Sequence, residues 1–286
     1  EIACIDIKEN VAYGEALDIC HSISSPINRN IKVYSGGFDT VKDADVIICD
    51  AGPSILPGQY ERLKLAKENV KNITEIMTEV VKYNTDAIFI MITNPLDVTT
   101  YLAATKFGWK HGRLFGTGTT LETLRFKYIL SRHFDVNPQD IQGYMLGEHG
   151  NSAFPAWSTV SIGGIRLNDL HNYFPEVKLD RELIHKQVVK TAYEVMDAKG
   201  WTNTGIASGA IRLAQAVFFD EKAVVPVSVP LTGEYGLKDV ALSLPSVVGK
   251  DGVEKRLALP LPEDELELLY KSSECIKEVL RASNLI

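Results

Sequence analysis

Short runs of apolar residues alternate with segments of helical periodicity along the first third of the chain. The runs are rich in β-branched residues and fall at residues 2–5, 31–35, 45–50 and 87–92. Between the last two runs, apolar side chains recur at the spacing of one helix face, at Leu63, Ala66, Val70, Ile73, Met77, Val80 and Val81. Strands separated by helices in this way predict a doubly wound α/β domain, whose parallel sheet binds ligands at the carboxyl ends of its strands.

The pattern changes near residue 116. Helical periodicity covers about 119–133, 179–198, 203–218 and 263–280. A strand pattern leads into Gly147, and alternating segments at 223–230 and 240–248 predict antiparallel strands. No flexible linker marks the change, so we expect a Rossmann-type domain over residues 1–115 joined without a tether to an α+β domain over residues 116–286.

The composition excludes several classes of protein. The chain has 286 residues, a formal net charge of −7 and 45% hydrophobic residues, as in an ordinary globular protein with a sizeable core. The acidic balance argues against a nucleic-acid partner, and no apolar run approaches the roughly 20 residues that cross a bilayer. The four cysteines form no CxxC pair and no zinc spacing. We therefore expect buried thiols, a reducing cytoplasmic compartment and no metal site.

Three residues at the ends of predicted strands are suited to a ligand. Asp6 could accept hydrogen bonds from the ribose hydroxyls of a dinucleotide, or could equally cap the helix that follows. Gly52 lets the backbone approach a cofactor closely, although a plain turn is the commoner reason for a glycine there. Asn94 offers both a donor and an acceptor, but Asn before Pro95 is also usual in turns. The Asn94–Pro95 bond is a candidate for a cis peptide.

Glu122, Arg125 and His149 are the candidates for binding and acid–base chemistry. Glu122 and Arg125 lie three residues apart on a predicted helix and share a face, either as a surface ion pair or with separate roles. In the second case Arg125 would grip a carboxylate as a bidentate fork, and Glu122 would orient a histidine. His149 lies between Gly147 and Gly150 just after a predicted strand, and its side chain can exchange a proton near neutral pH.

As a set, these motifs resemble the L-lactate/malate dehydrogenase family, and more closely its lactate dehydrogenase branch. The matching segments follow the family order over nearly the whole chain, at residues 14–18, 51–52, 62–63 with 69, 93–95, 116–119, 121–126, 147–152, 199–202 and 233–240. The resemblance implies an L-lactate dehydrogenase that uses NAD, reduces pyruvate to L-lactate in the cytoplasm during glycolysis and fermentation, and assembles as a homodimer or homotetramer.

The resemblance also implies roles for individual residues. His149 would give the proton to the substrate carbonyl and Glu122 would orient it, while Arg62 would polarise that carbonyl as a loop closes. Substrate would be bound by Arg125, Asn94 and Thr202. The NAD site would be formed by Asp6, Ala51, Gly52, Asn94, Thr117 and Ile206.

Three positions depart from the family pattern. Glu122 stands where the family usually has Asp, so the helix or the side chain must shift to keep contact with His149. Ile55, at the main specificity position, and Leu56 cannot pair with a second carboxylate, which disfavours malate and oxaloacetate. Relatives activated by fructose 1,6-bisphosphate carry an Arg and a His where this chain has Lys127 and Gln142, so we expect weak activation or none.

Two other functions stay open at this point. The apolar Ile55 and Leu56 would also suit a larger 2-oxo acid, as in an L-2-hydroxyisocaproate-type dehydrogenase, and a dehydrogenase scaffold can serve as a non-catalytic structural or binding protein. The chain contains no GxGxxG and opens at what family members have as their second strand. We therefore expect a Rossmann sheet without its first strand, in a sequence that lacks one βα unit of about 30 residues. NAD then rests on Asp6 and the resemblance alone.

Overall fold

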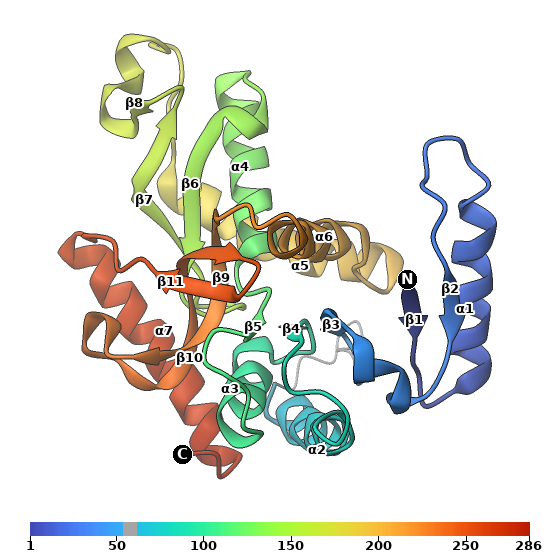
Figure 1. The fold of residues 1–286 in the computed structure, drawn as a ribbon. Coiled ribbons are helices and arrows are strands. Elements are labelled where there is room, and N and C mark those ends of the chain that lie inside the picture. Colours follow the sequence, from blue (N-terminus) through green and yellow to red (C-terminus); the bar gives the residue numbers. More distant parts are fainter. Residues whose placement is uncertain (54–61) are drawn as a thin grey trace.

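The computed structural model describes residues 1–53 and 62–286, with side chains described from residue 64 onward in the second range. The N-terminal strand β1 (Ile2–Cys4) leads through helix α1 (Glu9–Ser22) into β2 (Val33–Ser35). The two strands pair in parallel, with Ile2 opposite Val33. Neither pairs with another described strand, and this small unit stands apart at the right of Figure 1.

The main sheet has six strands in the order β11-β10-β9-β5-β4-β3. Three of them are parallel: β3 (Val46–Cys49), β4 (Ile88–Met91) and β5 (Leu114–Gly116). The other three are antiparallel: β9 (Ala223–Thr232), β10 (Lys238–Gly249) and β11 (Gly252–Arg256). The two halves join through one register pair, Gly116 opposite Ser228. The sheet is therefore mixed and runs across the predicted domain boundary.

The predicted fold class is confirmed. Strands and helices alternate around parallel strands in the first half of the chain, and the second half adds helices and antiparallel strands. Between β1 and β3, where a doubly wound sheet has its first strand, the described residues supply none, so the sheet is divided there.

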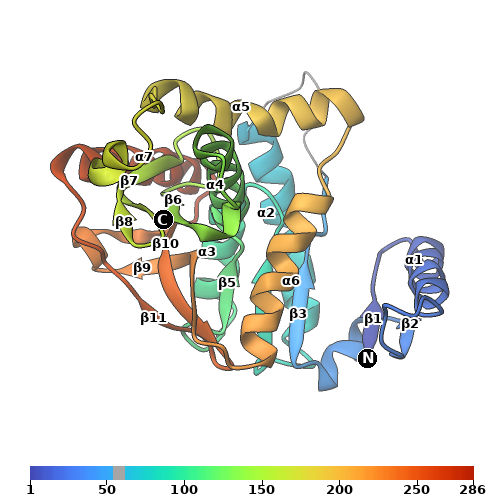
Figure 2. The ribbon, with the colours of Figure 1, turned by 90° about the horizontal axis from the view of Figure 1, so that it is seen from above.

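Helices lie on both sides of the main sheet. Figure 1 shows α2 (Arg62–Val80) and α3 (Leu96–Lys106) on one side, and α5 (Arg181–Lys199) and α6 (Thr204–Phe218) on the other. The last helix, α7 (Glu263–Ala282), packs against β10, and Figure 2 shows it on the far side from α6. Buried apolar residues of the main sheet and of α2, α3, α6 and α7 make up most of the two largest core clusters, whereas those of α5 pack with α4 in a third.

A smaller layer completes the second half of the chain. Strands β6 (Ile141–Leu146), β7 (Phe154–Ile162) and β8 (Ile165–Arg166) form an antiparallel sheet. Helix α4 (Thr120–Phe134) packs on β6 and encloses a third core with it. Short 3₁₀ helices occupy the connections Phe38–Asp43, Pro138–Asp140, Leu167–Asn172 and Glu234–Gly236.

The sequence pattern did not reveal α3, β5, β7, β8 or β11. Every residue of α3 from Leu96 to Ala103 is buried, so the helix carries no one-sided apolar stripe from which its period could be detected. Strands β5 and β8 have only three and two residues. The expectation of four buried thiols was wrong: the cysteines are free, but only Cys49 is fully buried. None of the described helices has the length and hydropathy of a membrane span.

Candidate active site

A cavity of about 420 Å³ opens at the carboxyl ends of β3, β4 and β5. Eight residues that the sequence singled out line it: Gly52, Asn94, Thr117, Glu122, Arg125, His149, Thr202 and Ile206. Asp6 and Ala51 do not line this cavity, since Asp6 follows β1 in the separate unit. Ile55 and Leu56 lie outside the described residues, and the side chain of Arg62, at the start of α2, also does.

Helix α4 presents Glu122 and Arg125 to this cavity from its first turns. Its amino end is fixed by Thr119, whose backbone N–H donates to Ser243 Oγ at 3.0 Å and whose hydroxyl donates to the carbonyl of Met145. Glu122 is buried. Arg125 is half-buried and makes no hydrogen bond or ion pair with the described side chains, so its guanidinium remains available to a ligand.

His149 meets Glu122 in the cavity. Nδ1 of His149 lies 2.8 Å from Oε1 of Glu122, and the two side chains are 18% and 7% exposed. The ring N–H is not aligned on the oxygen, and Oε2 of Glu122 has no hydrogen-bond partner among the described residues. The longer glutamate therefore keeps the charge contact but not the geometry of a straight hydrogen bond. Nε2 is left as the ring nitrogen available to a substrate.

The backbone of His149 is held by a buried carboxylate that sequence reasoning missed. Asp97, on α3, accepts a hydrogen bond from the His149 N–H at 2.7 Å and another from Ser228 Oγ at 2.6 Å. It is 1% exposed. In the sequence Asp97 looks like an ordinary acidic residue in a helix's first turn, and only the tertiary structure places it behind the histidine.

These carboxylates set the charge of the site. Burial alone would lower the pKa of His149, but the neighbouring Glu122 and Asp97 outweigh it and raise that pKa to about 9. Burial opposes ionisation of Glu122, yet His149 and Arg125 hold the pKa of its carboxyl below the usual value. Burial raises the pKa of Asp97 to about 6, against the hydrogen bonds from Ser228 and His149. At neutral pH the site therefore holds an imidazolium ready to give a proton.

The loops that follow β3 and β4 bring further groups suited to a ligand to the cavity. Gly52 has a φ of +129°, which favours glycine, and a side chain there would collide with Oδ1 of Asn69. The Asn94–Pro95 peptide is cis, and Nδ2 of Asn94 donates to no described residue. Thr117 and the half-buried Ile206 line the same cavity. This edge thus offers close backbone approach, a spare amide donor and an apolar contact, as a nicotinamide group needs.

Helix α5 closes the cavity with a mostly apolar wall that the sequence did not reveal. Its members are Val188, Val189, Ala192 and Met196. On the same helix, the Tyr193 hydroxyl donates to Oδ1 of Asn151 at 2.6 Å and so connects α5 with the loop that carries His149. Among the described residues, no group of three or more His, Cys, Asp or Glu side chains could hold a metal ion.

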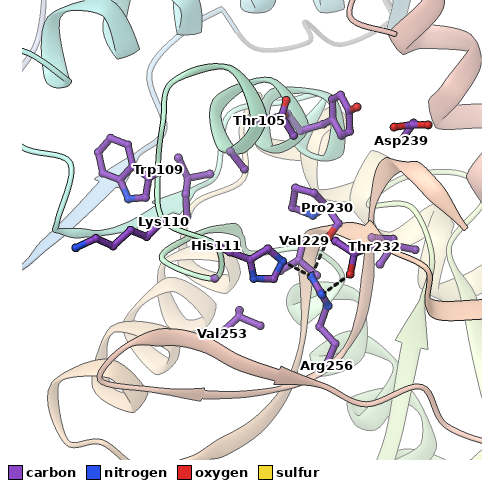
Figure 3. Close-up of a pocket in the computed structure, with 15 residues that line it drawn as sticks. Thr105, Trp109, Lys110, His111, Val229, Pro230, Thr232, Asp239, Val253 and Arg256 are labelled. Atoms are coloured by element: carbon purple, nitrogen blue, oxygen red, sulfur yellow. Dashed lines mark hydrogen bonds between the residues drawn. The ribbon is translucent and has the colours of Figure 1, made fainter.

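A second cavity, of about 270 Å³, lies at the amino end of β5, and Figure 3 shows its lining. Its arginine, Arg256, pairs with Glu234 at 2.6 Å and donates to Thr232, to the Pro230 carbonyl and to His111. The guanidinium of this cavity is therefore already engaged by neighbouring residues.

Comparison with known proteins agrees with this geometry. Residues 1–116 match a family model described as the NAD-binding domain of lactate/malate dehydrogenase, and residues 119–284 match the α/β C-terminal domain of the same family. An L-lactate dehydrogenase of Selenomonas ruminantium is 45% identical over 98% of this chain and 89% of its own length.

Two solved structures have the same fold. A lactate dehydrogenase from a Medee basin deep-sea metagenome library superposes with a TM-score of 0.94 at 31% identity, covering 99% of this chain and 91% of the other. The minor L-lactate dehydrogenase of Enterococcus mundtii gives a TM-score of 0.92 at 35% identity, over 98% and 88%. The chain is an NAD-dependent 2-hydroxy-acid dehydrogenase. It belongs to the lactate/malate dehydrogenase family, on the side of the L-lactate dehydrogenases.

Proposed function

We propose that the protein is an L-lactate dehydrogenase that reduces pyruvate to L-lactate with NADH and catalyses the reverse reaction. The observation that carries the proposal is the His149–Glu122 pair, which shares one cavity with Arg125, an arginine that makes no hydrogen bond or ion pair with a described side chain. A cationic proton donor beside a guanidinium suits a small acid that carries a carbonyl next to its carboxylate.

The chain's own residues bind, orient and protonate the substrate. Arg125 would hold the carboxylate, and Nε2 of His149 would give its proton to the carbonyl oxygen. NADH, when bound, would supply the hydride for the carbonyl carbon. Glu122 keeps the imidazolium charged, and Asn94 and Thr202 complete the substrate contacts. The family resemblance implies that Arg62 would stabilise the charge that grows on the oxygen. In the reverse direction neutral His149 accepts the proton from lactate.

The cofactor site that we propose combines residues from two parts of the molecule. Gly52, Asn94, Thr117 and Ile206 line the cavity on the nicotinamide side. Ala51 is adjacent to them in sequence, and its carbonyl accepts a hydrogen bond from the Thr93 hydroxyl at 2.8 Å. Asp6, two residues after β1, would bind the adenosine ribose.

Substrate choice is the finer part of the proposal. Ile55 and Leu56 offer no charge to a second carboxylate, so oxaloacetate should be a poor substrate. The apolar wall of α5 favours a second candidate, an enzyme for larger apolar 2-oxo acids such as 2-oxoisocaproate. We place pyruvate first because the relatives reported above are lactate dehydrogenases.

A substrate panel tests these alternatives. NADH absorbance would be followed with pyruvate, 2-oxoisocaproate and oxaloacetate, and kcat/KM compared; we expect pyruvate to lead. Oxaloacetate in first place would contradict the interpretation of Ile55 and Leu56. If neither the unchanged protein nor His149→Asn reduced any of the three oxo acids, a non-catalytic scaffold would be favoured instead.

Regulation and setting belong to the same proposal. Lys127 is half-buried beside Asp140, and Gln142 is exposed and uncharged, so the pyruvate saturation curve should hardly move when fructose 1,6-bisphosphate is added. We place the enzyme in the cytoplasm as a homodimer or homotetramer, where it would reoxidise NADH formed in glycolysis and so serve fermentation.

A further inference from the structure

Asn69 is a polar residue on the buried face of an otherwise amphipathic helix. On α2 it lies in line with Leu65, Ala66 and Ile73, which are buried, and Asn69 itself is 0% exposed. An apolar side chain would be the ordinary occupant of such a position, because a buried amide destabilises the fold unless its hydrogen bonds are made. Asn69 therefore calls for an explanation beyond packing.

The amide of Asn69 bridges two loops at the carboxyl edge of the sheet. Its Nδ2 donates to the carbonyl of Pro53, after β3, at 3.0 Å, and to the carbonyl of Asn94, after β4, at 2.6 Å. Neither carbonyl accepts another hydrogen bond from the described residues. Both loops carry groups of the candidate active site, namely Gly52 and Asn94.

The bridge begins where the strand ladder ends. The last backbone hydrogen bond between β3 and β4 runs from the Ile92 N–H to the Cys49 carbonyl, at 2.7 Å. One residue further along, the Thr93 hydroxyl donates to the Ala51 carbonyl. Beyond that point Asn69 alone, among the described residues, connects the two loops. Its Oδ1 also lies against the Cα of Gly52, where a side chain would collide with it.

We propose that Asn69 is a positioning residue that sets the separation between the cofactor loop at Gly52 and the substrate loop at Asn94. The identity of the molecules that these loops bind rests on the proposed function. The bridge itself rests only on the hydrogen bonds of Asn69. Because near-attack geometry is lost with a displacement of about 1 Å, freeing the two loops should reduce catalysis by roughly 10–100-fold.

The chain contains a matched control at the other edge of the same strands. Asn84 donates through Nδ2 to the carbonyls of Val41 and Ala44, at 2.9 and 3.0 Å, and its Oδ1 accepts from the N–H groups of Asp86 and Ala87. It thus connects the amino ends of β3 and β4, far along the strands from the candidate active site. Asn84 is a bridge of the same chemistry, but the segments that it connects contribute no residue to the lining of the active-site cavity.

The test compares Asn69→Leu with Asn84→Leu, because leucine keeps the shape of asparagine and removes both donors. We expect Asn69→Leu to lower kcat/KM for pyruvate about 10–100-fold and to raise the Kd for NADH, measured by fluorescence. Asn84→Leu should lower Tm and leave both constants within about twofold. Hydrogen–deuterium exchange should rise in peptides covering residues 50–53 and 93–97 only in Asn69→Leu.

The variant Asn69→Asp should have a pH-dependent activity that a mere loss of packing would not produce. An ionised aspartate puts negative charge against two carbonyl oxygens, whereas a protonated one donates to one of them again. The activity of Asn69→Asp relative to the unchanged protein should therefore recover as the pH falls from 8 towards 5.5.

The outcomes separate this proposal from the function on which it rests. If the unchanged protein reduces no oxo acid, the proposed function fails, while NADH binding and hydrogen exchange still test Asn69. If Asn69→Leu and Asn84→Leu lower Tm alike and Asn69→Leu leaves NADH affinity, kinetics and exchange at residues 50–53 and 93–97 unchanged, the positioning role is overturned.

Discussion

The two edges of the main sheet each carry a cavity with an arginine and a histidine, yet only one has the properties of an active site. At the amino edge Arg256 donates to Thr232, the Pro230 carbonyl and His111, and it pairs with Glu234. At the carboxyl edge Arg125 makes no hydrogen bond or ion pair with the described side chains.

The histidines of the two cavities, His111 and His149, differ in the direction in which their pKa is shifted. Burial and the neighbouring Arg256 lower the pKa of His111, which favours its neutral form. Carboxylates raise the pKa of His149 to about 9, against its burial. Similar residue types therefore build a self-satisfied structural cluster at one edge and a cationic site with spare donors at the other. Spare hydrogen-bonding capacity, rather than residue identity, distinguishes a binding site here.

The largest expected effect is at His149. His149→Asn removes the group that gives the proton, so kcat for pyruvate should fall by roughly 10²–10⁴-fold while NADH still binds. Steady-state kinetics and fluorescence titration measure the two properties. His111→Asn, at the opposite edge, is the control and should leave kcat unchanged; a similar fall in both variants would erase the contrast between the cavities.

Arg125→Lys should give the next largest effect. Lysine keeps the charge but loses the planar fork, and a charge-assisted hydrogen bond contributes about 1.5–3 kcal/mol, so KM for pyruvate should rise roughly 10–100-fold. Arg256→Lys is the matched change and should not alter KM. An unchanged KM in Arg125→Lys would mean that the substrate carboxylate is bound elsewhere.

The pH dependence of the two directions tests the raised pKa of His149. Pyruvate reduction needs the imidazolium, so kcat/KM should stay level up to about pH 9 and fall tenfold per pH unit above it, whereas lactate oxidation should rise towards that pH. In Glu122→Gln the partner charge is lost, and both limbs should move to lower pH by about 1–3 pH units. Unmoved limbs would show that Glu122 does not control the proton.

The same shift has a consequence for stability. Because the pKa of His149 is raised from 6.5 to about 9 on folding, its protonation stabilises the folded state fully below pH 6.5. This contribution is lost as the pH rises from 6.5 through 9.

The smallest effect is expected at Arg256. Arg256→Met breaks the pair with Glu234, whose side chains are 12% and 16% exposed, and should lower the free energy of unfolding by about 1–3 kcal/mol. Denaturant titration measures this change, and kcat/KM for pyruvate should not move. A loss of activity at constant stability would instead assign a functional role to the amino edge.

The sequence predicts the helices and strands whose apolar residues lie on one face, and it predicts the charged residues that occur in motifs. The apolar stripes of α2, α4 and α7 predict these helices, and the sequence motifs also group Glu122, Arg125 and His149, which the structure places in one cavity. Sequence reasoning missed α3, which is buried on all sides, and with it the carboxylate of Asp97 behind His149. Such contacts join residues 52 positions apart, and no local pattern encodes them.

Gly52 and Asn69 are distant in the sequence, yet each limits which residue can stand at the other position. A side chain at position 52 would occupy the space of the Asn69 amide, and the backbone there has a φ of +129°. The two positions are therefore not free to vary separately. In a mutational scan Gly52→Ala should be damaging alone and relatively milder when Asn69 is shortened to Ala, so the pair would emerge as an epistatic unit across 17 residues of chain.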